Sequence, residues 1–81
     1  MRMISGAQIR AARALLGWTT RELARRAIVS LSTAQLIEKA GGRPNASREA
    51  QAAVQVTLEA EGIEFLAGDA PGVRLHPKMP K

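Results

Sequence analysis

The chain has 81 residues, a length that supports one small domain and no second core. It contains no cysteine, which excludes a disulfide framework and a thiolate metal site. No apolar run approaches the roughly 20 residues needed to cross a bilayer, and the first residues lack the apolar core of a secretory signal. We therefore expect a cytoplasmic protein with no membrane partner, stabilised in part by a partner subunit.

The formal net charge of +5 is unevenly distributed along the chain. Residues 1–49 hold nine Lys or Arg and three Glu, whereas residues 50–81 hold three basic and four acidic residues. A basic surface attracts polyanions such as nucleic acids, but a solvated basic face without a partner has the same composition. The charge therefore favours a nucleic-acid partner only where it coincides with a binding motif.

The basic half predicts three short helices. Gly6 to Leu16 carries its apolar residues on one stripe, which is typical of an amphipathic helix, and Gly17 ends it. A second helix follows Thr19 and ends near Ala27. Its first residues have the form of a capping box, Thr19-Thr20-Arg21-Glu22, and its flanks form a hydrophobic staple, Trp18 with Leu23.

The third helix is expected from Leu31 to about Lys39, with Ser30 as its N-cap and Gly41-Gly42 after its end. Arg43-Pro44-Asn45 predicts a loop, and Ser47 can cap the helical segment that follows. We expect helices at about 48–53 and 55–61, with one continuous helix as the alternative, ended by Gly62.

The C-terminal part changes from helical to strand periodicity. Ile63–Leu66 and Val73–His76 are short strand-like segments that flank the turn residues Gly68 to Gly72, so they predict a hairpin over residues 63–76. An isolated two-stranded hairpin is marginal in water, so it must pack on the helices or pair with another subunit. Residues 77–81 are expected to form a flexible tail.

Two short helices broken by a tight turn are the arrangement that places one helix in the major groove of DNA. The segments that carry this pattern resemble the Cro/lambda-repressor-like, or XRE-type, helix-turn-helix family of prokaryotes and phages, and its small controller-type proteins in particular. They are Leu16-Gly17-Trp18-Thr19, Glu22-Leu23-Ala24, Val29-Ser30 and Ile37-Glu38. The resemblance covers about residues 6–62 and implies an all-α bundle of about five helices, here followed by a short C-terminal strand or hairpin. It further implies a homodimer that binds a palindromic operator on double-stranded DNA, and a transcription regulator or repressor acting at promoters that include its own.

The resemblance also implies a buried ion pair between Arg13 and Glu38, which links the first helix to the end of the third. Three positions depart from the family pattern. Ile28 stands where the turn usually has glycine, and because a β-branched residue disfavours the left-handed conformation, we expect a different backbone path there. Thr20 stands where glutamine is frequent, and Ala34 replaces a larger aliphatic residue.

If the third helix enters the major groove, its first residues and one face point to base edges. Gln35 can pair bidentately with adenine, and the two leucines can contact thymine methyl groups, with core or dimer packing as their alternative role. The face carries no arginine, so specificity draws on adenine, thymine methyls and DNA shape as much as on guanine. The predicted base contacts are Leu31, Ser32, Thr33, Gln35 and Leu36.

Contacts to the DNA backbone are expected at the start of the second helix and around the end of the third. They are Thr19, Thr20, Arg21, Lys39, Arg43, Asn45 and Arg48. Of Arg25 and Arg26, at least one is expected to be an ordinary solvated charge. The expected dimer interface comprises apolar residues that could instead close the core of the protomer, namely Val56, Leu58, Ile63, Phe65 and Leu66.

Catalytic chemistry finds little support in the sequence. His76 is the single histidine, with no cysteine or paired carboxylates near it, so we expect no enzyme activity, no metal and no cofactor. The main alternative to a regulator is a protein-interaction module with the same fold, such as an antitoxin or an antiactivator. A further alternative is an excisionase-like architectural protein that bends DNA.

Overall fold

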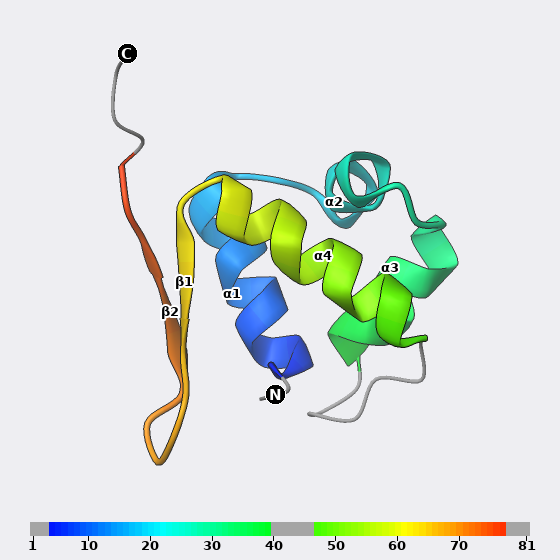
Figure 1. The fold of residues 1–81 in the computed structure, drawn as a ribbon. Helices are drawn as coiled ribbons and strands as arrows, with labels where there is room; N and C mark the ends of the chain where they lie inside the picture. Colours follow the sequence, from blue (N-terminus) through cyan, green and yellow to red (C-terminus); the bar gives the residue numbers. More distant parts are fainter. Residues whose placement is uncertain (1–3, 40–46, 78–81) are drawn as a thin grey trace.

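The computed structural model describes residues 4–39 and 47–77. Its order of elements is α1 (Gly6–Leu16), α2 (Thr20–Ala27), α3 (Leu31–Lys39), α4 (Arg48–Ala60), β1 (Ile63–Leu66) and β2 (Gly72–Leu75). The two strands run along one side of the molecule beside α1, while α2 and α3 lie on the other side and α4 crosses between them (Figure 1). The fold is therefore mostly helical with a small antiparallel sheet.

The helices begin at hydroxyl caps. Ser5, Thr19 and Ser47 each accept a hydrogen bond on the side-chain oxygen from the backbone N–H three residues later. A complete capping box forms at Ser5 and Gln8. The box predicted at Thr19 is only half formed, because the Glu22 carboxylate accepts hydrogen bonds from arginines of its own helix instead.

The backbone of the turn between α2 and α3 differs from the path that we expected at Ile28. Ile28 adopts the left-handed conformation, with φ 58° and ψ 49°, although we expected its β-branched side chain to force another path. Its N–H donates to the carbonyls of Ala24 and Arg25, and the side chain is 90% exposed, so nothing crowds it. The chain thus keeps the backbone path that a glycine would favour and retains the conformational strain of a branched residue there.

The segment after Ser47 forms one helix, Arg48–Ala60, rather than the two helices expected at 48–53 and 55–61. No proline or glycine interrupts these residues, so the hydrogen-bonded ladder continues to its end. Residues 4–39 and 47–77 therefore contain four helices rather than about five. None of these four is long and apolar enough to span a lipid bilayer.

A single apolar core joins the four helices, and Ile63 of β1 also belongs to it. Its fully buried side chains include Ile9 from α1, Leu23 from α2, Ile37 from α3 and Val54 from α4. Ala12, Ala24, Ala27 and Ala34 are also buried, and their small size lets the helices lie close together. The position of α3 is thereby fixed from its inner side.

The hairpin is attached to the helices by polar contacts as well as apolar ones. Ile63 pairs with Leu75 and Leu66 with Gly72, so the second strand begins one residue earlier than predicted. The side-chain amide of Gln8 in α1 donates to the carbonyls of Leu66 at 2.7 Å and Gly72 at 2.9 Å. One buried glutamine therefore joins both strands to the first helix.

Candidate nucleic-acid interface

Helix α3 buries one face and exposes the other. Ala34, Ile37 and Glu38 are buried against the rest of the protein. The exposed side chains recur at the spacing of one helical stripe, which places them on a common outer face; they are Ser32, Gln35, Leu36 and Lys39. Leu31 and Thr33 are half-buried at the start of the helix.

The first turn of α3 is held by its own hydroxyl groups. The Thr33 N–H donates to the Ser30 hydroxyl oxygen at 3.1 Å, and the Ser30 hydroxyl donates to the Thr33 hydroxyl oxygen at 2.9 Å. Ser30 therefore caps α3, as its sequence position predicts. Because both hydroxyls are engaged, Ser32 is the freer donor and acceptor of this turn.

The end of α3 is fixed by a buried ion pair with α1. Arg13 Nε and Nη2 each lie 3.1 Å from a different oxygen of the Glu38 carboxylate. The side chain of Arg13 is 23% exposed and that of Glu38 only 8%. Arg13 also donates to the carbonyl of Trp18 at 3.0 Å, so it ties the first two helices to the third. The pair expected from the sequence is present and has this structural role.

The start of α2 lies against the end of α3. The Thr20 hydroxyl donates to Glu38 Oε1 at 3.3 Å, which places the first turn of α2 beside the buried pair. Thr20 is half-buried, whereas Thr19 and Arg21 are exposed. In the described segments no acidic side chain forms an ion pair with Arg21, so its charge is not neutralised by the protein.

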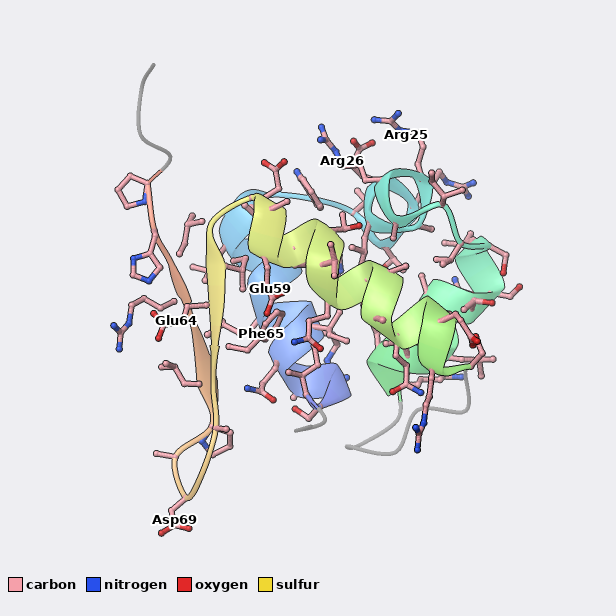
Figure 2. All side chains as sticks on the ribbon, in the orientation of Figure 1. Arg25, Arg26, Glu59, Glu64, Phe65 and Asp69 are labelled. Carbon is pink, nitrogen blue, oxygen red and sulfur yellow. The ribbon has the colours of Figure 1, made fainter. Side chains whose placement is uncertain are left out.

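Arg25 and Arg26 differ from Arg21 because both bind one carboxylate. The Glu22 side chain accepts from Arg25 Nη2 at 2.6 Å and from Arg26 Nε at 2.5 Å. The hydrogen bonds from these two arginines lower the pKa of Glu22 to about 2. Arg26 also stacks over Trp18, its guanidinium carbon 4.5 Å from the ring centroid. Both arginines point away from the body of the protein, as Figure 2 shows, and their shared carboxylate weakens them as phosphate ligands.

The remaining predicted backbone contacts lie near the end of α3 and the start of α4. Lys39 and Arg48 are exposed at these two helix ends, which Figure 1 places on the same side of the molecule. Arg43 and Asn45 fall outside the described residues.

One cation that sequence reasoning missed lies beside this surface. Arg10 is exposed on α1, and its Nη1 donates to the backbone carbonyl of Glu38. Arg10 stands three residues before Arg13, so the two lie on the same side of α1 and meet α3 together. That spacing, combined with the expected pair of Arg13 and Glu38, was the signal that could have identified Arg10.

The expected dimer interface needs correction. Leu58 is fully buried and Ile63 is 4% exposed, so both belong to the core of the protomer rather than to an exposed interface. Phe65 packs against that core, and Figure 2 shows it pointing from β1 towards the helices. Val56 is 63% exposed and Leu66 is half-buried. The apolar residues of α4 and β1 thus serve mainly to close the monomer.

The outer side of the hairpin carries a separate polar cluster. Glu64 Oε1 lies 2.6 Å from His76 Nε2 and 3.6 Å from Arg74 Nη1. The hydrogen bond from His76 lowers the pKa of Glu64. Within residues 4–39 and 47–77 no group of three or more His, Cys, Asp or Glu could hold a metal ion.

The geometry therefore brings together Arg10, Ser32, Gln35, Leu36 and Lys39 on one side of the molecule, around a rigidly held α3. Comparison with known proteins assigns no family to this chain, since no family model and no curated protein matches it.

Proposed function

We propose that this protein is a sequence-specific double-stranded DNA-binding regulator of transcription. The proposal rests on one observation: α3 buries one face against the protein and exposes the opposite face to solvent. The inner face of α3 is fixed by Ala34, Ile37 and the Glu38 ion pair. The outer face exposes Ser32, Gln35, Leu36 and Lys39, which are not part of the apolar core. A helix held rigidly from behind with a polar outer face suits insertion into the major groove.

The charge around α3 supports the same proposal. Arg21 at the start of α2, Lys39 at the end of α3 and Arg48 at the start of α4 are all exposed. Exposed cations that flank a recognition helix can contact phosphates on either side of the groove, where they supply affinity and set the register of the helix on the duplex. Gln35 then supplies base discrimination, because its amide matches the donor and acceptor pattern of adenine.

We further propose that the protein acts as a homodimer on a palindromic operator, including one at its own promoter. Single helix-turn-helix domains reach only a few base pairs, and two-fold dimers place two such helices about 34–36 Å apart along the duplex. Val56, Phe65 and Leu66 are the members of the expected interface that the protomer leaves partly accessible. Sedimentation with and without duplex measures this association, and a protein that stays monomeric in both conditions would refute it.

The test of DNA binding is footprinting and an electrophoretic shift assay on the DNA directly upstream of the gene. Gln35→Ala should weaken binding to the protected sequence by about 5- to 150-fold, the equivalent of one bidentate base contact of about 1–3 kcal/mol. The same change on another helix, Gln55→Ala in α4, should leave binding unchanged. Arg21→Ala should weaken binding to all duplexes alike.

Absence of any shifted duplex at low salt would contradict the proposal. Recovery of one fixed protein partner under the same conditions would favour the interaction-module alternative instead. Strong bending of the bound duplex would favour the architectural alternative.

A further inference from the structure

An open hollow of about 360 Å³ lies between α1 and the last turns of α3. Among the residues that the structure describes, it is lined by Arg10, Gln35, Glu38 and Lys39. Beside the hollow, two arginines of one turn of α1 bind Glu38. Arg13 binds its carboxylate, and Arg10 binds its backbone carbonyl.

The charges in this hollow are not balanced. The Glu38 carboxylate accepts hydrogen bonds from Arg13 and Thr20, and its charge is paired with that of Arg13. No carboxylate of the described chain forms an ion pair with Arg10 or Lys39. The hollow thus combines two positive side chains with the amide of Gln35 and is open to solvent.

We infer that this hollow binds one phosphate of the DNA backbone, held by Arg10 from α1 and Lys39 from α3. The inference rests on the proposed function and adds a specific phosphate site to it. A guanidinium has five N–H donors, so Arg10 can keep its bond to the Glu38 carbonyl and still donate to a phosphate oxygen. Lys39 supplies a point charge from the opposite side.

The position of the hollow gives this phosphate a second effect. Gln35 lines the hollow, so a phosphate bound there fixes the distance between the DNA backbone and the Gln35 amide. Phosphate contacts set the register in which base contacts are made. Arg10 is therefore a positioning residue for Gln35 as well as a source of affinity.

The test compares Arg10→Gln with the wild type on a duplex that the wild type enriches from a random pool. Glutamine can still donate to the Glu38 carbonyl, but it carries no charge. The slope of log affinity against log salt should become shallower by about 0.9 for each protomer bound, the value of one lost phosphate contact on B-DNA. The penalty of Gln35→Ala should also be smaller in the Arg10→Gln background.

Arg74→Gln on β2 is the matched control, because it removes the same charge from the hairpin beside Glu64. Its slope should equal that of the wild type. Arg10→Lys should keep the wild-type slope, since it keeps the charge. If circular dichroism shows that Arg10→Gln is unfolded, Lys39→Gln provides the second variant and should give the same loss of slope.

The outcomes separate the two claims. A wild-type protein that binds no duplex overturns both the proposed function and this inference. Duplex binding whose salt slope is the same in wild type, Arg10→Gln and Lys39→Gln overturns the phosphate site alone. A loss of slope in Arg10→Gln, with Arg74→Gln unchanged, supports it. Because the proposed function already makes Lys39 a phosphate contact, a loss of slope in Lys39→Gln supports the site only together with a smaller penalty of Gln35→Ala in that background; without that smaller penalty it counts against the site.

Discussion

The α3 side and the hairpin side of the molecule are held in place by different interactions. Helix α3 is fixed by fully buried apolar side chains and the ion pair of Glu38, all on its inner face. The hairpin is fixed by the apolar side chains of Ile63 and Phe65, by two hydrogen bonds from the Gln8 amide, and by a close backbone approach at Gly62. The residues that place α3 are thus separate from those it exposes, whereas the hairpin adds to its apolar contacts two hydrogen bonds that come from one side chain, Gln8.

Substitutions in the two regions should therefore have different effects on the fold. Ser32, Gln35 and Leu36 can vary without loss of the fold, because the core does not use them. A few substitutions at the hairpin junction can loosen the strands while α3 stays in place.

The largest effect is expected on the α3 side, for Glu38→Ala. The change leaves the Arg13 guanidinium without its carboxylate in a largely buried position. Loss of one partner of a buried pair costs about 3–5 kcal/mol, and because Arg13 keeps some exposure we expect about 3 kcal/mol. Urea unfolding followed by circular dichroism measures it. Glu59→Ala, on the exposed side of α4, should change stability by less than about 0.5 kcal/mol; equal losses in the two variants would refute the role of the pair.

On the hairpin side, Gly62→Ala should have the next largest effect. Gly62 has a φ of 101°, and an added Cβ would clash with the backbone carbonyl oxygen of His76. The N–H of His76 donates to the Gly62 carbonyl at 2.8 Å, so the backbone has little freedom to move. We expect a loss of about 1–3 kcal/mol in unfolding free energy.

Gly68→Ala is the control for Gly62→Ala. Gly68 has a similar φ of 96°, but no atom lies within 4 Å of the position that an added Cβ would take. Gly68→Ala therefore measures the cost of a positive φ without a steric clash, and it should reduce the free energy of unfolding less than Gly62→Ala does. Equal losses of unfolding free energy in the two variants would show that the close approach between Gly62 and His76 does not affect stability.

Gln8→Ala should loosen the hairpin without displacing α3. The change removes both hydrogen bonds to the carbonyls of Leu66 and Gly72, and also the bond from the Ser5 N–H to the Gln8 side chain in the capping box; we expect the two hairpin bonds to contribute about 1–2 kcal/mol of the loss. Amide hydrogen exchange should accelerate in β1 and β2 but remain slow in α3. Gln55→Ala makes the same chemical change on α4 and should leave both regions protected. Faster exchange in α3 after Gln8→Ala would show that the two sides are coupled.

The smallest effect is a gain in stability from Ile28→Gly. Release of the left-handed isoleucine is worth about 1–2 kcal/mol, and the greater freedom of glycine in the unfolded chain offsets about 0.5–1 kcal/mol of it. We therefore expect a net gain of up to about 1.5 kcal/mol in the free energy of unfolding, measured by thermal or urea unfolding. Ile28→Ala keeps the left-handed strain and should gain less. A destabilised Ile28→Gly variant would mean that the exposed isoleucine makes a favourable contact.

Much of this arrangement follows from local sequence signals. Gly17 and the hydroxyl caps at Thr19, Ser30 and Ser47 fix helix ends within a few residues of their own positions, so they could be identified from the sequence. The pairing of Arg13 with Glu38 was accessible only through the family resemblance, because it joins residues that lie far apart in the chain.

Other features depend on which of two possible interactions a residue makes, and the sequence alone does not decide between them. Glu22 had two possible partners, the Thr19 N–H and the neighbouring arginines, and the charged partners prevailed. Leu58 and Ile63 looked equally suited to a core or an interface, and only the packing of α4 against the hairpin decides between them. At Ile28, the hydrogen bonds of the turn outweighed the residue's own conformational preference.

The central claim is that the outer face of α3 contacts DNA, and amide chemical-shift mapping tests it most directly. Isotope-labelled protein is titrated with the duplex enriched from a random pool. We expect the largest shifts at Ser32, Gln35 and Leu36, smaller shifts at Arg21, and none in the hairpin. Shifts concentrated in β1 and β2 with α3 unchanged, or a pool from which no duplex is enriched, would contradict the claim.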